Sequence, residues 1–393
     1  MKTNIPERIA ALREAMKQQK VDAYIIPSSD PHLSEYPADR WKSREWISGF
    51  TGSAGTIVVT ADKAGLWTDS RYFLQAASQL EGSGIELYKL ALPETPSITE
   101  FLLHELHAGQ AVGLDGQTYS AAEASALANK LSRKEIKLDT SADLIEGIWK
   151  DRPAVPGNPI FEMPEALSGA SVHEKLDLIN NQLRSEGADC LILAALDEIA
   201  WTFNIRGTDV TYNPVVVSYA FVSEDESVLF IKPEKLTAEI TEHLKKEGVT
   251  LAEYSMIQRY LSRLPENSRV FVDMNKTNVS LYDAIPGNCT IVEGISPANH
   301  LKSIKNETEI KGFQNAVVKD GVALTKFYIW LEKQMAEGTQ VTEISAAEKL
   351  TALRAEQPQY IMDSFGTICG YAEHGAIVHY SATPETDATL KPE

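Results

Sequence analysis

Residues 7–26 read ERIAALREAMKQQKVDAYII, and residues 174–193 read EKLDLINNQLRSEGADCLIL. In both stretches apolar side chains recur at i, i+3 and i+7, which is the spacing of one face of a helix. A short apolar run, 23–26 or 190–193, follows each helical pattern and is typical of a buried strand. The constant offset of 167 residues predicts an internal duplication of a helix–strand unit.

A second pair of stretches extends this repeat. WISGFTG at 46–52 resembles WTFNIRG at 201–207, and strand-like apolar segments follow in both copies. The predicted strands are 56–60, 65–68, 215–222 and 227–231. Helical and strand patterns alternate through the first 300 residues, which predicts two tandem α/β units.

Proline and glycine mark the boundaries of these units. Residues 151–160 read DRPAVPGNPI, and because proline fixes φ and lacks an N–H, they predict an extended linker. A second boundary is expected near 294–298. The predicted domains are 1–155, 165–298 and 299–393.

The third predicted domain begins with helical patterns and ends without them. A helix is expected over 306–334, and Thr342–Glu343 is expected to start a second helix that continues over 344–354. The residues after Arg354 are polar and rich in glycine, so we expect strands and loops that frame a cleft there.

Composition limits the class of protein. The chain has 393 residues, of which 43% are hydrophobic and 23% charged, as in soluble globular proteins. Its net charge of −18 disfavours nucleic acid and gives no reason to expect an anionic membrane partner. The N-terminus lacks the apolar core of a signal peptide, and no run approaches the roughly 18 apolar residues of a membrane span. The sequence therefore predicts a cytoplasmic protein.

Several common catalytic and metal-binding motifs are missing from the sequence. Its three cysteines are far apart and form no C-x-x-C pair, so neither a disulfide framework nor a zinc knuckle is indicated. GFTGSAGT at 49–56 lacks the Gly-Lys-Ser/Thr of a phosphate loop and indicates turn glycines. There is no H-E-x-x-H or G-x-S-x-G. The scattered histidines are interpreted mostly as surface or helix-face residues: His32, His104, His107, His173, His243 and His300.

Arg71 is the first candidate for a functional residue. It lies in Asp69-Ser-Arg-Tyr, just after a predicted strand that ends in Leu-Trp-Thr. An arginine in such a turn can point its planar fork of donors into a cleft and bind a carboxylate or a carbonyl. It can equally pair with Asp69 and hold the turn together, and local features leave both interpretations open.

His379 is the second candidate. It follows residues 376–378, which are predicted to form a short strand, and precedes Tyr380. An imidazole at a strand end can donate a hydrogen bond to an oxyanion or transfer a proton near neutral pH. A purely structural hydrogen bond is the alternative.

Three segments of the chain together resemble a known family. They are WTDSRYFLQAA at 67–77, LDEIAWTFNIRGTDVTYNPV at 196–215, and SFGTI…GAIVHYSATPET at 364–386. They are similar to the three-domain Xaa-Pro aminopeptidases of the cytosolic aminopeptidase P type. The resemblance implies an α/β fold with two tandem creatinase-like domains, each a mixed sheet flanked by helices. The start of an α+β pita-bread catalytic domain is expected to follow them.

The resemblance also implies the activity and the cofactors. Such enzymes remove the N-terminal residue from peptides whose second residue is proline, by means of water activated between two divalent metal ions, usually manganese. The family's metal ligands are two aspartates, a histidine and two glutamates, which follow the Pro-Glu-Thr segment. We therefore expect the catalytic domain to be truncated in this chain, which would hold no catalytic metal pair and be inactive by itself. Proline-containing peptides are the expected substrates, and a homodimer is the expected assembly.

Two positions match residues to which the family assigns roles. Arg71 matches an arginine of the first domain that reaches the substrate, and His379 matches the histidine that contacts the peptide and stabilises the tetrahedral intermediate. The resemblance therefore favours a substrate-binding Arg71 and a catalytic, substrate-binding His379. The chain departs from the family pattern at His374, where Asn is usual, and at Gly366. We expect His374 to hydrogen-bond the turn as Asn does and not to be a metal ligand.

Other functions fit parts of the sequence. A proline dipeptidase or a creatinase-type hydrolase would share the catalytic domain, but these normally carry one front domain. A histone-chaperone type of protein keeps a peptidase-like fold without metals and is expected to have long acidic tails, which this chain lacks. A non-catalytic binding module is the remaining alternative.

Overall fold

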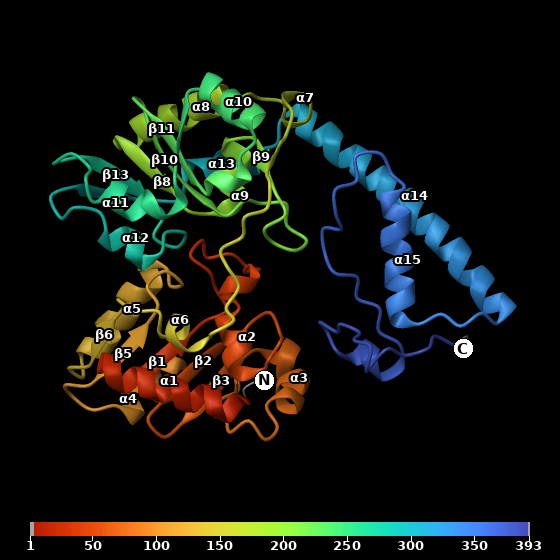
Figure 1. Ribbon diagram of the computed structural model, residues 1–393, viewed down its shortest axis with the longest axis horizontal. Helices are drawn as coiled ribbons and strands as arrows, with labels where there is room; N and C mark the ends of the chain where they lie inside the picture. Colours follow the sequence, from red (N-terminus) through yellow and green to blue (C-terminus); the bar gives the residue numbers. More distant parts are fainter. Residues whose placement is uncertain (1–3, 392–393) are drawn as a thin grey trace. The chain divides into compact units, whose positions relative to one another are not determined.

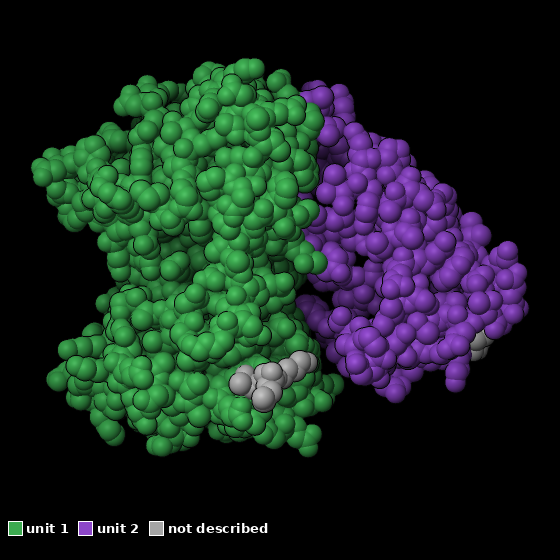
Figure 2. Space-filling view, viewed as in Figure 1, with its two compact units in different colours: residues 1–165, 170–211, 215–304 green, residues 166–169, 212–214, 305–393 purple. Residues whose placement is uncertain are grey.

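The computed structural model describes residues 4–391 (Figure 1). The outer ends of the first and third predicted domains, residues 1 and 393, lie outside this range. The chain forms two compact units, which Figure 2 colours separately. Unit 1 consists of 1–165, 170–211 and 215–304, and unit 2 consists of 166–169, 212–214 and 305–393. The division into three domains stays a prediction.

The first repeat of unit 1 is built on a six-stranded mixed sheet of order β4-β3-β2-β1-β5-β6. Neighbouring strands are antiparallel from β1 through β3 and parallel elsewhere. The strands are β1 (Ala23–Ile26), β2 (Thr56–Thr60), β3 (Ala64–Thr68), β4 (Glu86–Lys89), β5 (Ala111–Leu114) and β6 (Lys137–Asp139). The helices are α1 (Ile5–Gln19), η1 (Asp39–Trp41), α2 (Ser43–Ser48), η2 (Ser70–Tyr72), α3 (Phe73–Gln79), α4 (Ile98–Glu105), α5 (Ala121–Ser132) and α6 (Leu144–Ile148).

The second repeat has a sheet of the same design, β12-β11-β10-β8-β13-β14. Its strands are β8 (Cys190–Leu193), β10 (Ser218–Ser223), β11 (Ser227–Ile231), β12 (Val249–Ala252), β13 (Arg269–Val272) and β14 (Thr290–Glu293). A short ribbon is added by β7 (Phe161–Glu162) and β9 (Ile205–Arg206). The helices are α7 (Glu165–Ser168), α8 (Val172–Ser185), α9 (Leu196–Thr202), η3 (Pro233–Lys235), α10 (Ala238–Lys246), η4 (Tyr254–Met256), α11 (Ile257–Leu261), α12 (Val279–Asp283) and α13 (Pro297–Ser303).

The predicted helix–strand pairs are confirmed as α1–β1 and α8–β8. Both helices bury the predicted apolar face, for example Leu12 of α1 and Ile179 of α8, each with no exposed surface. One face of the first sheet is covered by α1, α2, α3 and α6, and the other by α4 and α5. The second sheet is likewise covered by α8, α9, α10 and α13 on one face and by α11 and α12 on the other. The two repeats therefore share both strand order and layering.

One predicted strand starts later than the sequence suggested. Residues 215–217 were expected to open β10, which begins instead at Ser218. The N–H of Val217 donates to the Asp209 carboxylate at 2.7 Å, so this backbone group bonds a side chain and not a neighbouring strand. Val215 and Val217 pack against Trp41 of the first repeat, in a separate apolar cluster.

The two repeats dock through corresponding loops, those that follow β5 and β13. Ser120 and Asn278 cap α5 and α12 and form an antiparallel bridge with each other. On one side of the bridge, Ala121 N donates to Thr277 O at 2.9 Å. On the other side, Val279 N donates to the carbonyl of Tyr119 at 2.9 Å. Each repeat thus offers the same loop to the other.

His32 belongs to the first repeat, but its side chain contacts residues of the second repeat. Its side chain is 1% exposed, and its ring centroid lies 4.4 Å from that of Tyr219. Nδ1 lies 2.9 Å from the carbonyl oxygen of Ala194, which can only accept, so Nδ1 carries the hydrogen. Nε2 lies 2.9 Å from the hydroxyl of Tyr254. The interpretation of His32 as a surface or helix-face histidine is therefore wrong.

This burial predicts a pH dependence of stability. Burial lowers the pKa of His32 from 6.5, while the carboxylate of Asp30 opposes the shift. The unfolded chain binds the proton more readily than the folded chain, because the pKa of His32 is lower in the folded state. Neutral His32 therefore contributes fully to folding stability above pH 6.5. This contribution is lost as the pH falls from 6.5 toward the pKa of the folded state. We expect the free energy of unfolding of the wild type to fall between pH 6.5 and 5. Its slope against pH should exceed that of His32→Gln by up to about 1.4 kcal/mol per pH unit. Urea unfolding at a series of pH values measures this pH dependence. The control is His104→Gln, which replaces an exposed histidine. Equal slopes of unfolding free energy against pH in wild type and His32→Gln would contradict the prediction.

Most of unit 2 consists of two helices and an irregular C-terminal segment, and most of the short α7 also belongs to it. The helices are α14 (Glu307–Glu337) and α15 (Glu343–Ala355), joined by side-chain contacts such as Arg354 Nε to Asp320 at 2.7 Å. The predicted apolar face of α14 is largely exposed: Phe313 is 61% and Val317 is 70% exposed. At 31 residues α14 is roughly 46 Å long, whereas the 13 residues of α15 cover only part of it (Figure 1).

The strands expected after Arg354 are not formed in the described residues 356–391. This segment contains the 3₁₀ helix η5 (Ala372–Ala376) and one isolated bridge between Thr342 and Thr389. The short strand expected at 376–378 is therefore also wrong. Within residues 4–391, every helix is too short or too polar to span a bilayer.

Candidate functional site

The two predicted site residues belong to different units: Arg71 lies in unit 1 and His379 in unit 2. Each site is described within its own unit.

Arg71 lies in η2, the helical turn that follows β3. Asp69 caps this turn by accepting from Arg71 N, and its two oxygens accept from Nε and Nη2 of the same arginine, both at 2.8 Å. Hydrogen bonding to Asp69 is the main cause that raises the pKa of Arg71. The guanidinium also lies over the ring of Tyr72, and the side chain is 41% exposed. Asp69 therefore holds Arg71 in one orientation while much of its side chain faces solvent.

His379 lies in a tight turn of unit 2. The turn is closed by Tyr380 N, which donates to the carbonyl of Ile377 at 3.2 Å. His379 is half-buried, whereas Val378 beside it is 60% exposed and Tyr380 after it is buried. The predicted position at a strand end is wrong, because Ala376 ends a 3₁₀ helix and the chain then turns. No neighbouring strand fixes the imidazole, so side-chain contacts must do so.

The residues on either side of His379 donate hydrogen bonds that converge on Glu343, the first residue of α15. Its carboxylate is fully buried and accepts hydrogen bonds from the hydroxyl of Tyr380 at 2.8 Å and from Nδ1 of His374 at 2.9 Å. It also accepts from the backbone N–H groups of Tyr371 at 2.7 Å and Ala388 at 3.1 Å. Burial by itself would raise the pKa of Glu343, but these four donors outweigh it and lower the pKa to about 2. The His374 imidazole was expected to hydrogen-bond its own turn, and it bonds the carboxylate of Glu343 instead.

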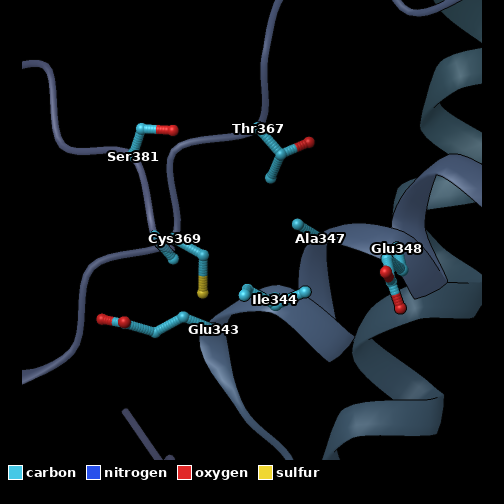
Figure 3. Close-up of a pocket in the computed structure, with 8 residues that line it drawn as sticks. Glu343, Ile344, Ala347, Glu348, Thr367, Cys369 and Ser381 are labelled. Carbon is cyan, nitrogen blue, oxygen red and sulfur yellow. The ribbon is translucent and has the colours of Figure 1, made fainter. Parts of the chain in front are cut away.

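A small cavity lies beside this carboxylate (Figure 3). Its volume is about 160 Å³, and its lining residues are Glu343, Ile344, Ala347, Glu348, Thr367, Cys369, Ser381 and Ala382. The buried hydroxyl oxygen of Thr367 has no hydrogen-bond partner. Burial, together with the charges of Glu343 and Asp387, raises the pKa of the Cys369 thiol. The thiol is thus held in its neutral, unreactive form.

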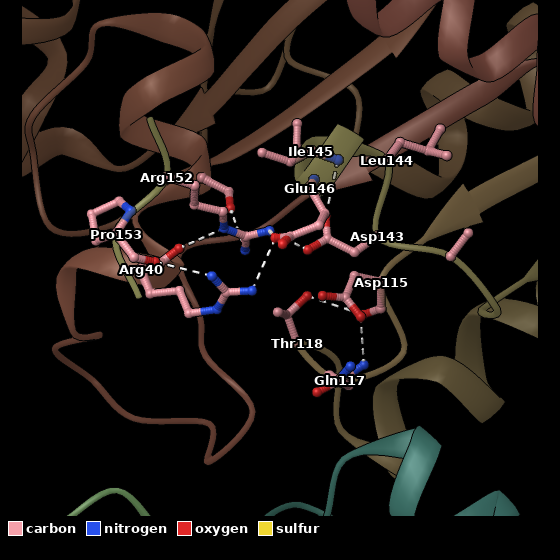
Figure 4. Close-up of polar contacts among 12 residues, drawn as sticks. Arg40, Asp115, Gln117, Thr118, Asp143, Leu144, Ile145, Glu146, Arg152 and Pro153 are labelled. Atoms are coloured by element: carbon pink, nitrogen blue, oxygen red, sulfur yellow. Dashed lines mark hydrogen bonds and ion pairs between the residues drawn. The ribbon is translucent and has the colours of Figure 1, made fainter. Parts of the chain in front are cut away.

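A second polar cluster was missed by sequence reasoning (Figure 4). Asp115 directly follows β5, and burial followed by the charge of Asp143 raises its pKa to about 7. Arg152 is 5% exposed on its side chain and pairs with Asp143 and Glu146, and Arg40 pairs with the same glutamate at 2.9 Å. The two arginines connect the 151–160 linker to the first repeat. Asp115 is a separate feature of this cluster, a carboxyl group with a pKa raised to about 7. An aspartate after a strand was its only signal in the sequence.

The described residues do not fit a dinuclear metal centre. Among residues 4–391, no three His, Cys, Asp or Glu side chains gather closely enough to hold a metal ion. No chemical step is therefore derived through a metal.

Comparison with known proteins identifies both repeats. The family described as Creatinase/Prolidase N-terminal domain matches residues 8–148 and again residues 151–309. Curated relatives include a probable Xaa-Pro aminopeptidase P of Laccaria bicolor, 39% identical over 99% of this chain and 61% of its own length. Aminopeptidase P2 of Arabidopsis thaliana is 36% identical over 100% of this chain and 60% of its own length. This chain thus spans about three fifths of the length of these relatives.

A solved structure also matches almost the whole chain. It is an X-prolyl aminopeptidase from Caenorhabditis elegans, described as a cytosolic enzyme with a di-nuclear active site. It is 30% identical and superimposes with a TM-score of 0.93 over 99% of this chain and 66% of its own. The fold of this chain is therefore shared with that protein.

Proposed function

This chain belongs to the aminopeptidase P family of Xaa-Pro aminopeptidases with creatinase N-terminal domains, and we propose that the whole protein removes the first residue from peptides whose second residue is proline. The observation that carries this proposal is the similarity to the C. elegans X-prolyl aminopeptidase over 99% of the chain. The family domain occurs twice, at 8–148 and 151–309, whereas a proline dipeptidase normally carries one front domain.

We also propose finer features of the whole protein. They are a three-domain plan with divisions near 155 and 298, a pita-bread fold that begins in 299–393, and a cytoplasmic homodimer. Two divalent metal ions, with manganese as the proposed identity, would supply the activated water in the whole protein. The di-nuclear active site described for the C. elegans enzyme supports the presence of two metal ions.

Within the chain, we assign roles to the two predicted site residues. His379 would donate a hydrogen bond to the carbonyl oxygen of the bond before proline as negative charge develops there. Arg71 would bind the substrate with the exposed part of its guanidinium, while Asp69 keeps it oriented. Proline lacks an N–H and has a fixed φ, so its recognition depends on shape and carbonyl contacts.

The activity is tested on the complete gene product with Mn²⁺ and the tripeptide Arg-Pro-Pro. We expect release of free arginine from Arg-Pro-Pro and none from Arg-Ala-Pro, as followed by chromatography. Equal cleavage of both peptides, or of neither, contradicts the proposal. Cleavage of the dipeptide Arg-Pro alone would indicate a proline dipeptidase.

In the same assay, Arg71→Ala is expected to raise KM more than it lowers kcat, because the arginine binds the substrate and does not take part in the bond change. Arg71→Lys keeps the charge but loses the planar fork, so it should raise KM to an intermediate value. Steady-state kinetics over a range of Arg-Pro-Pro concentrations measures both constants. An unchanged KM in Arg71→Ala would leave Arg71 with only its structural pairing to Asp69.

A further inference from the structure

One buried carboxylate joins three separate segments of unit 2. Glu343 begins α15, and the donors to its oxygens come from 371–374, from Tyr380 and from Ala388. The first two of these segments lie on either side of His379 in the chain. The ring of His374 also stacks on the ring of Tyr380, with centroids 4.4 Å apart and planes 21° from parallel.

The chemistry of this arrangement requires a carboxylate. An ionised carboxylate only accepts, at about four lone-pair positions, and here four groups donate to it. In a glutamine at this position, the amide NH₂ would face a backbone N–H, either that of Tyr371 or that of Ala388. Two donors cannot satisfy each other, so at least one of the segments would have to move.

The hydrogen bonds to Glu343 are linked to the turn that contains His379 through a few intervening residues. The hydroxyl of Tyr380 donates to Glu343 at 2.8 Å, and its oxygen lies 3.2 Å from Oγ1 of Thr386. The backbone N–H of the same tyrosine closes the turn that contains His379. On the other side, Ile377 N donates to the carbonyl of His374 at 3.1 Å, which links the start of the turn to the second donor of Glu343. Both ends of the turn are therefore attached to one carboxylate.

We propose that Glu343 is a positioning residue that fixes the orientation of the His379 turn by accepting hydrogen bonds from both of its ends. The inference rests on the proposed function for the meaning of that orientation, because His379 is the group proposed to contact the substrate. The geometric part of the inference concerns this chain alone and is measured without any substrate.

The test compares four variants by NMR of the histidine Cε1–Hε1 groups in the 393-residue protein. Glu343→Gln and Tyr380→Phe are expected to shift the His379 Cε1–Hε1 resonance, because the ring environment changes when the turn moves. Glu348→Gln removes the same charge from an exposed position on the same helix and should leave the resonance unchanged. His374→Asn keeps a short side-chain donor at the turn and should also leave it close to its wild-type position.

Activity of the complete gene product on Arg-Pro-Pro gives a second measurement. Because a misplacement of about 1 Å can cost about 10²-fold in rate, kcat should fall toward that extent in Glu343→Gln, with KM changing far less. A folded Glu343→Gln variant with an unchanged His379 resonance overturns the inference. If Glu343→Gln does not fold, the same outcome in Tyr380→Phe overturns it. A shifted resonance with normal kcat would uphold the positioning and contradict the proposed role of His379 instead.

Discussion

Replacing His379 by alanine is expected to lower kcat of the complete gene product on Xaa-Pro peptides by about 10²–10³-fold, the usual effect of removing one donor to a developing oxyanion. The loss should appear mainly in kcat, because the hydrogen bond strengthens only as charge develops on the carbonyl oxygen. The exposed Val378 and the half-buried imidazole beside it indicate that this turn lies at the surface of unit 2, where a peptide can reach it.

The measurement combines steady-state kinetics with metal analysis. Metal content should be the same in wild type and His379→Ala, because the imidazole is proposed as a hydrogen-bond donor and not as a ligand. His300→Ala replaces another exposed histidine, on α13 of unit 1, and should retain full activity. Wild-type turnover in His379→Ala would remove the residue from the mechanism, and loss of metal together with activity would indicate a ligand instead.

The largest expected effect on stability concerns the buried ion pair of the second repeat. Asp209 accepts from Lys235, and the two side chains are 1% and 0% exposed. Burial lowers the pKa of Lys235, while the charge of Asp209 acts in the opposite direction. Removal of one partner leaves a buried charge without compensation. Asp209→Asn should therefore lower the free energy of unfolding by about 3–5 kcal/mol.

Urea unfolding followed by tryptophan fluorescence measures this loss. The double variant Asp209→Leu/Lys235→Met should recover much of it, because two apolar side chains replace the pair without leaving a charge. Asp189→Asn removes one partner of the exposed pair with Arg269 and should change stability little. A stability of Asp209→Asn close to that of wild type would show that Lys235 is neutral in the folded protein.

The sequence predicts some parts of this chain well because periodicity reports burial directly. The faces of α1 and α8 that carry Leu12 and Ile179 are buried as predicted. The spacing of apolar residues does not predict burial everywhere. Phe313 lies on the predicted apolar face of α14, yet most of its side chain is exposed. The helix itself was still predicted, because the spacing of its apolar residues is a local signal.

The sites are harder to predict because they depend on distant contacts. Arg71 and Asp69 are two residues apart, so their pairing was among the open interpretations, and the structure shows it. Glu343 was noticed only as a helix start, since its donors lie 28 to 45 residues further along the chain. His32 contacts Tyr254, which is 222 residues away, and no local pattern indicates such a partner.

The bridge between Ser120 and Asn278 shows that the two repeats meet through equivalent surfaces, as the subunits of a symmetric dimer do. Such a surface is complementary to itself, so a free copy of either repeat would present it to any other copy. The extended connection at 151–160 keeps the second repeat at a high effective concentration near the first, and the intramolecular contact therefore outcompetes contacts between molecules. Because both repeats belong to one chain, their association does not depend on protein concentration.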